Sequence, residues 1–277
     1  MNLLKKYTWR VIYSPPATGA MNMAIDEAIL YAVSRKEQLP TLRLYAWSPP
    51  CLSLGYAQPS TDVDLSRLHS LGWSIVRRPT GGRAILHADE LTYSITAPLD
   101  HPLVAGSILE SYSRLAKALL ETLYRLGLPA RADPQYDHPQ GAQPGDPVCF
   151  EVPSNYEITV NGKKIIGSAQ ARRNGGVLQH GALPLFGDIN RINWVLYYED
   201  DIKRQQASER LSARATTVEA ILHKPISWLF AAETMQTAFS DVFSIEFIKS
   251  DMSESEQHYA LKLAEERYAS PQWTFRV

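Results

Sequence analysis

Residues 156–169 read YEITVNGKKIIGSA and contain the clearest structural signal in the chain. Two runs rich in β-branched residues are separated by Asn161 and Gly162, a pair that suits the positive φ angles of a type I′ turn. The stretch therefore predicts a β-hairpin in which Val160 pairs with Lys163. On one face of this hairpin, alternation places Lys164 with Thr159, Ile166 and Ser168. The opposite face carries Tyr156, Ile158, Val160, Lys163 and Ile165.

Further strand and helix patterns lie on both sides of the hairpin. Strand patterns cover residues 41–47, 51–56, 73–78, 83–87, 91–97, 176–183 and 244–248, and helical patterns cover about 22–33, 62–71, 107–126, 217–222, 227–239 and 253–268. The first helix is predicted to begin at Asn22 as its cap, with acids in its first turn. Residues 131–147, rich in Pro, Gly, Gln and Asp, predict a long mobile loop.

These patterns predict one α+β domain. Strands mixed with helices, without an internal repeat or a break in composition, suit a single domain over residues 1–277 with a short C-terminal extension from about 250. A chain of 277 residues with 45% hydrophobic content is long enough to bury a large core.

Composition and charge exclude several classes of protein. No segment approaches the roughly 18 to 20 apolar residues that span a bilayer, and Met1–Lys6 lacks the apolar run of a signal peptide, so we expect a cytoplasmic protein without a membrane partner. The net charge of −1 argues against a general affinity for nucleic acid. Basic residues cluster within 77–83 and 163–173, as either a solvated face or a docking patch for an acidic partner.

The two cysteines, Cys51 and Cys149, are not arranged as metal ligands, because neither belongs to a CxxC pair or has a histidine at ligand spacing. Cys149 lies at the exit of the predicted loop, just before the hairpin, and is a candidate nucleophile if nearby cations or a base lower its pKa. The alternative is a small buried hydrophobic residue. Cys51, which opens an apolar strand, fits that alternative better.

Lys164 and a glycine turn are the other candidates for chemistry. A lysine held beside an acyl carbonyl stabilises developing negative charge, whereas a solvent-facing lysine would have no such role. Gly81 and Gly82 follow a strand and are flanked by arginines, so backbone can approach a ligand closely there. This is neither a GxGxxG nor a GxxxxGK[ST] motif, and no nucleotide site is indicated. His87 and His180 could each act as a base or position the acceptor, and the alternative for each is a hydrogen-bonded structural histidine.

Three motifs in this order resemble those of the lipoate-protein ligase A family. They are RRPTGGRAILH at 77–87, KIIGSAQ at 164–170 and QHGAL at 179–183. The segment DPVCFEVPSNYEI at 146–158 is similar to the octanoyl-carrier-protein:protein octanoyltransferase branch of that family, and the resemblance covers nearly the whole chain. It implies two mixed β-sheets flanked by helices, as in biotin and lipoate protein ligases, with the acyl chain in a hydrophobic tunnel.

The resemblance also implies roles for particular residues. Cys149 matches the acyl-accepting cysteine and Lys164 the family lysine near the acyl carbonyl. The residues expected to bind the acyl substrate are Arg78, Gly81, Gly82, His87, Gly167, Ser168, Ala169 and His180. ATP-using ligases usually have a third glycine where this chain has Arg83 and an acid where it has Ala88, so adenylation is not expected.

The expected function is transfer of octanoyl from octanoyl-acyl carrier protein, through a Cys149 thioester, to a lysine of a lipoyl-domain protein. The acceptor would be a protein such as glycine cleavage H protein or a 2-oxoacid dehydrogenase E2. No cofactor or metal is expected, because a thioester is already activated. The alternatives are an ATP-dependent lipoate or octanoate ligase, an octanoyl amidotransferase between lipoyl-domain proteins, and a non-catalytic binding protein.

Overall fold

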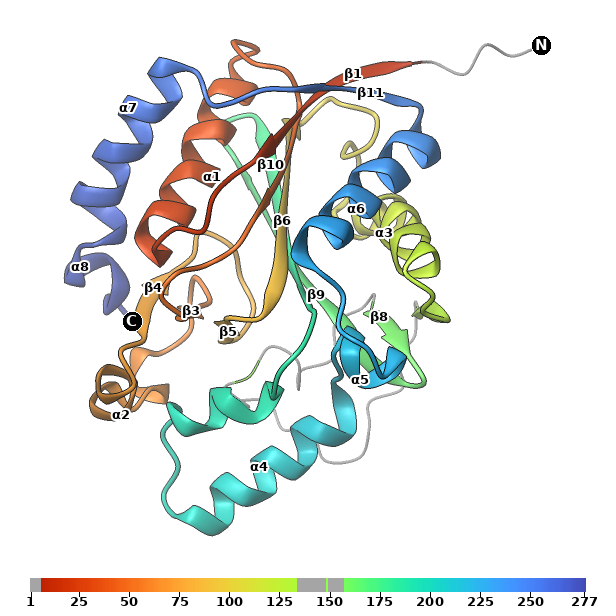
Figure 1. Ribbon diagram of the computed structural model, residues 1–277. Coiled ribbons are helices and arrows are strands. Elements are labelled where there is room, and N and C mark those ends of the chain that lie inside the picture. The colour runs from red at the N-terminus through yellow and green to blue at the C-terminus, as the bar shows by residue number, and fades with distance from the viewer. Residues whose placement is uncertain (1–5, 134–147, 149–156) are drawn as a thin grey trace.

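The computed structural model describes residues 6–133, 148 and 157–277 (Figure 1). Its strands are β1 Tyr7–Tyr13, β2 Thr41–Tyr45, β3 Cys51–Leu54, β4 Ser74–Arg77, β5 Ile85–His87, β6 Glu90–Pro98, β7 Ala130–Asp133, β8 Glu157–Val160, β9 Lys163–Arg173, β10 Gly176–Pro184 and β11 Ile245–Lys249. Its helices are α1 Gly19–Ser34, α2 Leu65–Ser70, α3 Ile108–Arg125, α4 Asp201–Arg214, α5 Val218–Leu222, α6 Trp228–Phe243, α7 Glu254–Leu263 and α8 Pro271–Thr274.

The strands form two mixed sheets, as the family resemblance implied. The large sheet has eight strands in the order β11-β1-β2-β6-β10-β9-β8-β7, and the small sheet has three in the order β4-β3-β5. In the large sheet β1 runs parallel to β2 and β11, whereas β6, β10 and β9 form antiparallel pairs. In the small sheet β3 is parallel to β4 and antiparallel to β5. Helices cover both faces of the large sheet, so the α+β prediction is confirmed.

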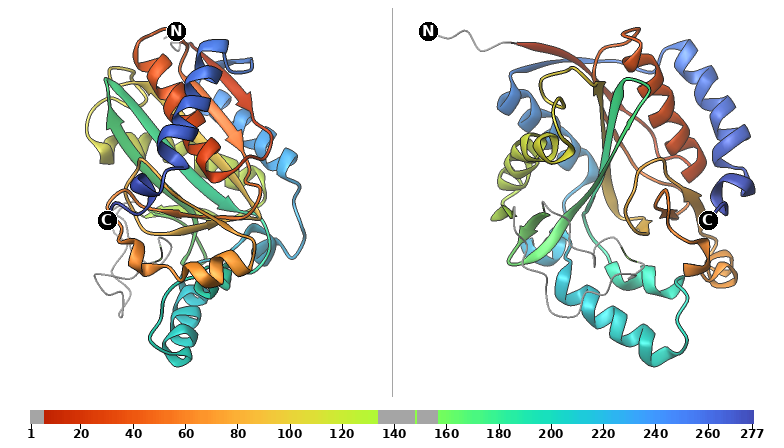
Figure 2. Two further views of the ribbon diagram at one scale, coloured as in Figure 1. Left: turned by 90° about the vertical axis from the view of Figure 1, so that its left-hand side faces the viewer. Right: turned by 180° about the vertical axis from the view of Figure 1, so that it is seen from behind.

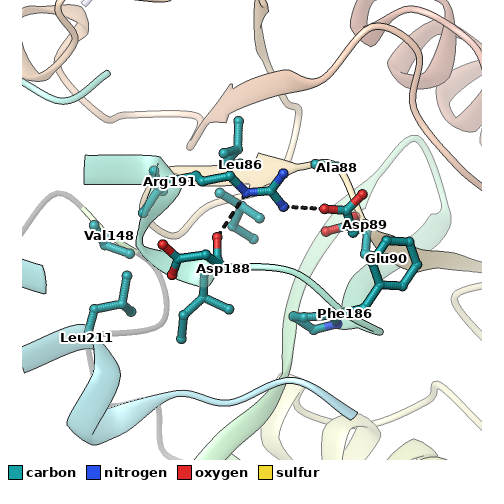
Figure 3. A pocket seen from close by; sticks show the side chains of 13 residues that line it. Leu86, Ala88, Asp89, Glu90, Val148, Phe186, Asp188, Arg191 and Leu211 are labelled. Carbon is teal, nitrogen blue, oxygen red and sulfur yellow. Dashed lines mark hydrogen bonds and ion pairs between the residues drawn. The ribbon is translucent and has the colours of Figure 1, made fainter. Parts of the chain in front are cut away.

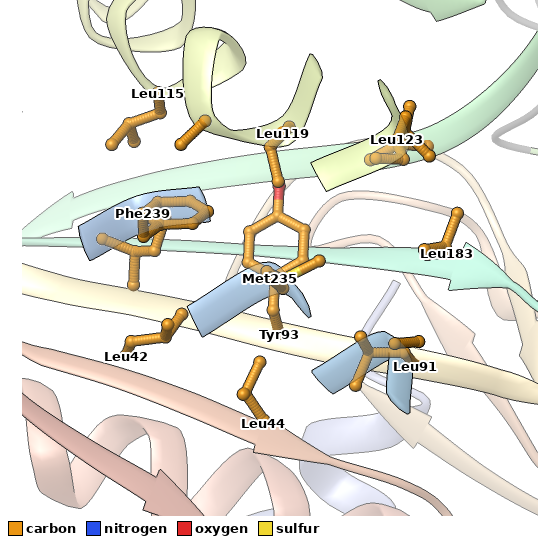
Figure 4. Packing of buried hydrophobic residues seen from close by; sticks show 14 of the residues in the cluster. Leu42, Leu44, Leu91, Tyr93, Leu115, Leu119, Leu123, Leu183, Met235 and Phe239 are labelled. Carbon is orange, nitrogen blue, oxygen red and sulfur yellow. The ribbon is translucent and has the colours of Figure 1, made fainter. Parts of the chain in front are cut away.

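Helices pack against both faces of the large sheet through apolar side chains. On one face α3 and α6 pack together, and Leu119, Met235 and Phe239 meet Tyr93 and Leu91 of β6 (Figure 4). On the other face α1 packs against β6 and β10, and α7 covers α1, as the left view of Figure 2 shows. The amphipathic stripe of α3 therefore faces the core, and Ser107 and Glu110 close its N-terminus as a capping box.

The hairpin of β8 and β9 has the predicted register at its turn, where Val160 pairs with Lys163 and Thr159 with Lys164. Beyond Thr159 the register shifts by one residue, so that Ile158 pairs with Ile166. Such a β-bulge turns a strand locally. Ile158 therefore lines the same cavity as Lys164, and its predicted place on the opposite face was wrong.

The first helix begins four residues earlier than predicted. Thr18 is the N-cap of α1, and its hydroxyl accepts from the amide of Met21. Asn22 instead lies inside the helix and donates from its side chain to the carbonyls of Ala17 and Ala46. The predicted first-turn acids, Asp26 and Glu27, are thus the eighth and ninth residues of α1, and Asp26 is fully buried.

Strands β1 and β7 and helix α4 went unrecognised in the sequence. Strand β7 occupies residues 130–133, inside the segment predicted as loop from 131, and pairs with β8. Strands β5 and β6, predicted as neighbours, belong to different sheets. The rest of the predicted loop, residues 134–147, lies outside the described residues.

The segment predicted as a C-terminal extension packs against α1. A buried ion pair joins Glu256 of α7 to Arg10 of β1, and Arg267 reaches Glu27 of α1. The single-domain boundary stays a prediction. None of the helices in the described part combines the length and apolar character needed to cross a membrane.

Candidate active site

Lys164, near the start of β9, is buried against the neighbouring strand β8. Its Nζ lies 2.8 Å from Oε1 of Glu157, and the two residues are 5% and 3% exposed. Of the two alternatives left open by the sequence, a solvent-facing lysine is therefore excluded by the geometry. A cation held in a low-dielectric setting acts strongly on nearby charge, although its carboxylate partner offsets part of that field.

Lys164 shares a groove with the glycine turn. The groove runs between β9 and two loops, residues 56–58 and 79–83, and encloses an empty volume of about 1390 Å³ that includes open solvent. Gly81, Gly82, Ser168 and Lys164 all line it. Residues from the small sheet's loop and from the large sheet's hairpin thus face one space, which the sequence alone could not show.

Close packing and side-chain bonds fix the glycine turn. Nη2 of Arg78 donates to the carbonyls of Gly81 and Arg83 at 2.8 and 2.7 Å. A Cβ on Gly55 would lie 1.8 Å from the carbonyl oxygen of Gly82, so this approach requires glycine at position 55. Gly82 itself has a φ of +93°, which L side chains rarely adopt. The turn is therefore a rigid feature of the groove wall.

A mostly apolar pocket adjoins the groove. It has an empty volume of about 340 Å³, which includes open solvent, and is lined by Met23, Tyr45, Trp47, Arg78, Ile85, His87, Thr92, Gly167, Ser168, Ala169, His180, Gly181 and Ala182. Because Ser168 lines both spaces, the pocket and the groove meet at this residue. Every predicted substrate-binding residue therefore lines one space or the other, and six of them line the pocket.

His180 faces a buried carboxylate. Its Nδ1 lies 3.5 Å from Oδ2 of Asp26, and its Nε2 is 2.5 Å from the hydroxyl of Thr80 in the glycine turn. Burial lowers the pKa of His180, with the charge of Arg78 adding to this effect, and outweighs the opposing influence of Asp26. His180 is therefore neutral near neutral pH, and its Nε2 shares a hydrogen bond with the Thr80 hydroxyl of the glycine turn.

Asp26 is held ionised within a polar network. Burial opposes its ionisation, but the Arg43 guanidinium and the bonds from its neighbours outweigh burial and lower the pKa of Asp26. Arg43 donates to Oδ1 at 2.9 Å, Ser94 to Oδ1 at 2.8 Å and Tyr45 to Oδ2 at 2.9 Å. The carboxylate behind His180 is thus fixed in place.

His87 is similarly paired on the other side of the pocket. Its Nδ1 lies 2.6 Å from Oε1 of Glu90, and its Nε2 is 2.8 Å from the hydroxyl of Ser53. The indole of Trp47 stacks on the imidazole with 4.0 Å between ring centroids. Glu90 also accepts from Thr92. Two histidines, each backed by an acid, therefore line one small pocket.

Cys149 lies outside the described residues. Its chain neighbour Val148 is buried, forms a β-bridge with Ala84, and borders a further apolar pocket with Leu86 and Leu211 (Figure 3). An ion pair of Arg191 and Asp89 lies at the edge of that pocket. The described residues contain no cluster of His, Cys, Asp or Glu suited to hold a metal ion.

Cys51 has the surroundings of a structural residue. It is fully buried at the start of β3, where burial raises the pKa of its thiol to about 12. A thiol with so high a pKa is a poor nucleophile. A Cβ on Gly19 of α1 would come within 2.4 Å of Cys51 Sγ, so the helix and the thiol pack closely.

A family model described as the lipoyl protein ligase A/B catalytic domain matches residues 18–240. The chain belongs to this family. The octanoyltransferase LipM of Carboxydothermus hydrogenoformans is 39% identical over 272 residues, which cover 97% of this chain and 99% of the relative. The octanoyltransferase LipM of Bacillus subtilis is 34% identical over 277 residues, with 99% and 100% coverage.

Solved structures of the lipoyl protein ligase family have the same fold. A bi-partite lipoate protein ligase from Thermoplasma acidophilum superposes with a TM-score of 0.79 at 25% identity, over 97% of this chain and 96% of that one. A lipoate-protein ligase A bound with ATP gives the same TM-score at 25% identity, over 97% and 98%. The family and fold resemblance seen in the sequence motifs is therefore confirmed.

The acidic partners of Lys164, His180 and His87 were not predicted from the sequence. Glu157 directly follows the resembling segment's tyrosine, and cross-strand pairing in the hairpin was the signal that could have indicated it. Asp26 was interpreted as an acid of the first helical turn. Glu90 lies three residues after His87, between two strands that the sequence joined as neighbours. Of the three carboxylates, Asp26 alone meets its histidine through packing between residues far apart in the chain, because Glu157 and Glu90 lie seven and three residues from their partners.

Proposed function

We propose that the chain is an octanoyltransferase that moves an octanoyl group from the thioester of an acyl carrier protein to a lysine of a lipoyl-domain protein. The observation that carries this proposal is the buried Lys164 cation facing the Gly81–Gly82 turn across a groove that joins an apolar pocket. Relatives named octanoyltransferase LipM, 34% and 40% identical over nearly full length, support the same reaction.

The reaction we propose has two steps. The Cys149 thiolate attacks the octanoyl carbonyl, the carrier's thiolate leaves and takes up a proton, and an enzyme thioester remains. The neutral amine of the acceptor lysine then attacks that thioester, loses a proton and forms an amide, which releases the Cys149 thiolate. Both steps build negative charge on the carbonyl oxygen, and the Lys164 cation would stabilise that charge.

Two facts support Cys149 as the acyl acceptor. It lies in the segment that resembles the octanoyltransferase branch, and its neighbour Val148 pairs with Ala84, two residues after Gly82. The octanoyl chain would occupy the apolar pocket between Gly167–Ala169 and the paired histidines His87 and His180. Arg78 would act by holding the glycine turn.

Mass spectrometry of the enzyme mixed with octanoyl carrier protein tests the mechanism. We expect wild type and Cys51→Ala to gain one octanoyl group and Cys149→Ala to gain none. Cys51→Ala is the matched control, because the same substitution is made at a buried cysteine. Transfer by Cys149→Ser at the normal rate would reject the thioester intermediate.

The second candidate is an ATP-dependent ligase, favoured by the similar fold of a lipoate-protein ligase A bound with ATP. Against it stand Arg83 and Ala88, where ligases usually have glycine and an acid. Free octanoate with ATP, offered in place of the carrier thioester, distinguishes the two. We propose the thioester donor, and product formed from octanoate and ATP would contradict it.

The setting of this reaction is part of the same proposal. The acceptor would be a lipoyl domain such as that of glycine cleavage H protein or a 2-oxoacid dehydrogenase E2. We propose that residues 1–277 act as one domain in the cytoplasm without a nucleic-acid or membrane partner. Fractionation of cells that express the chain tests the compartment.

A further inference from the structure

The groove that contains Lys164 is strongly basic along its length. Its described lining includes Arg83, Lys164, Arg172 and Arg173 and no aspartate or glutamate. Arg172 donates to the backbone carbonyls of Val104 and Ser107, whereas within the described part of the chain no carboxylate pairs with Arg83 or Arg173. Unneutralised guanidinium groups that line a groove attract an anionic ligand.

At the end of the groove where β9 finishes, two arginines stack on one aromatic ring. The guanidinium carbons of Arg173 and Arg276 lie 4.5 and 3.8 Å from the centroid of the Tyr56 ring. Arg276 also lies 4.3 Å from the ring centre of Trp273 and donates to the Tyr56 carbonyl at 2.6 Å. Stacking holds a guanidinium by its face and leaves donors at its edge for an oxyanion.

The charges of this cluster act on its own members. The hydrogen bond and charge of Arg276, followed by the charge of Arg173, lower the pKa of Tyr56. Burial first, and then the charge of Arg276, lower the pKa of Arg77 behind the groove. The shift of Tyr56 has the sign expected beside concentrated positive charge, whereas that of Arg77 is led by burial.

The spacing along β9 relates this cluster to the reactive end. A strand rises about 3.3 Å per residue, so Arg173 lies roughly 17 Å along β9 from Ser168, where the groove meets the apolar pocket. A phosphopantetheine arm is about as long as six extended residues, or roughly 20 Å. An arm with its thioester near Ser168 would therefore bring its phosphate to the stacked arginines.

We propose that Tyr56, Arg173 and Arg276 form a binding site for the phosphate ester of the pantetheine arm that carries the acyl thioester. This inference rests on the proposed function, because it concerns the donor of that reaction. The same phosphate ester occurs on an acyl carrier protein and on coenzyme A. The cluster would align the arm along the groove, with the acyl group directed into the pocket.

The test rests on two small donors that differ only in the phosphate, with two larger donors that carry the same phosphate ester. Octanoyl-pantetheine lacks it, octanoyl-4′-phosphopantetheine has it, and octanoyl-coenzyme A and octanoyl carrier protein present it from two sources. With wild type we expect kcat/KM to rise about tenfold on adding the phosphate, the size of effect produced by one charge-assisted hydrogen bond. Equal values for the two small donors would overturn the proposal.

The variants Arg173→Gln and Arg276→Gln localise the effect. Each should lower kcat/KM about tenfold for the three phosphate-bearing donors and leave octanoyl-pantetheine within about twofold. The matched control is Lys203→Gln, which removes one exposed positive charge on α4. Losses that are equal with and without the phosphate, or losses confined to the carrier protein, would overturn a phosphate site.

Direct binding separates this inference from the proposed reaction. Titration calorimetry with 4′-phosphopantetheine and with pantetheine should give tighter binding of the phosphorylated arm to wild type, with the difference lost in Arg173→Gln/Arg276→Gln. No product from any octanoyl donor would refute the proposed function and the inference that rests on it. Product with every donor and no preference for the phosphate would refute the inference alone.

Discussion

The variant Glu157→Gln tests the structural part played by the buried ion pair with Lys164. At 2.8 Å and an effective dielectric constant of 20, the attraction between the two charges is about 6 kcal/mol. Desolvation of both groups offsets much of this attraction, and loss of one partner from such a pair typically costs about 3 to 5 kcal/mol. We therefore expect the free energy of unfolding in urea to fall by about 3 kcal/mol.

The double variant separates stability from chemistry. Lys164→Met should destabilise the fold by a similar amount, because it leaves Glu157 buried without that cation, whereas Lys164→Met/Glu157→Gln should recover much of the loss. Acyl transfer should fall about 10² to 10³-fold in both variants without Lys164, including the stable double variant. Additive losses of stability would refute the pairing argument, and normal transfer by the double variant would refute the role of the cation.

Three further predictions concern the glycine turn and the buried acid–histidine pair. Gly55→Ala should lower the free energy of unfolding in urea by about 1 to 3 kcal/mol and reduce octanoyl transfer, because the added Cβ would displace the Gly82 carbonyl. Unchanged transfer activity would contradict this prediction. Asp26 has a lowered pKa in the folded chain, so the stability that its carboxylate contributes is present above the unfolded pKa near 4 and is lost as pH falls through the folded pKa. The difference in unfolding free energy between wild type and Asp26→Asn should therefore shrink on acidification. A difference that stays constant with pH would count against this prediction. His180 also has a lowered pKa in the folded chain, so below about pH 6.5 the unfolded chain binds a proton at this residue that the folded chain does not. The unfolding free energy of wild type should therefore fall more steeply below that pH than that of His180→Gln. Parallel pH curves for the two proteins would refute this prediction.

The sequence predicted the secondary structure best where the local pattern was strong. The hairpin turn at Asn161 and Gly162, the long helix α3 and the Gly-Gly turn were all recognisable, because turn residues and amphipathic spacing act over a few residues. Strand β7 was missed, since four residues beside a segment rich in proline and glycine give little periodic signal. The bulge after Thr159 was also missed, because a shift in register depends on the partner strand.

The candidate site was predictable in its residue types and not in its partners. Motif resemblance selected Lys164, Gly81, Gly82 and the two histidines, and these line adjoining spaces in the structure. It did not select Asp26, which lies 154 positions before its histidine in the chain. An acid inside a helix has no local feature that distinguishes a buried partner from a solvated side chain.

The sequence by itself determined the family, the two mixed sheets and the set of polar residues available for acyl chemistry. The family and the two mixed sheets follow from the resemblance carried by motifs that are contiguous in the chain, whereas turn chemistry and periodicity predicted individual strands and helices. Only the tertiary structure decided that Lys164 is buried against Glu157, that both histidines have carboxylates behind them, and that Arg173 and Arg276 meet on Tyr56. The physical reason is that burial and charge pairing depend on distances through space, which packing of the two sheets and the C-terminal segment sets.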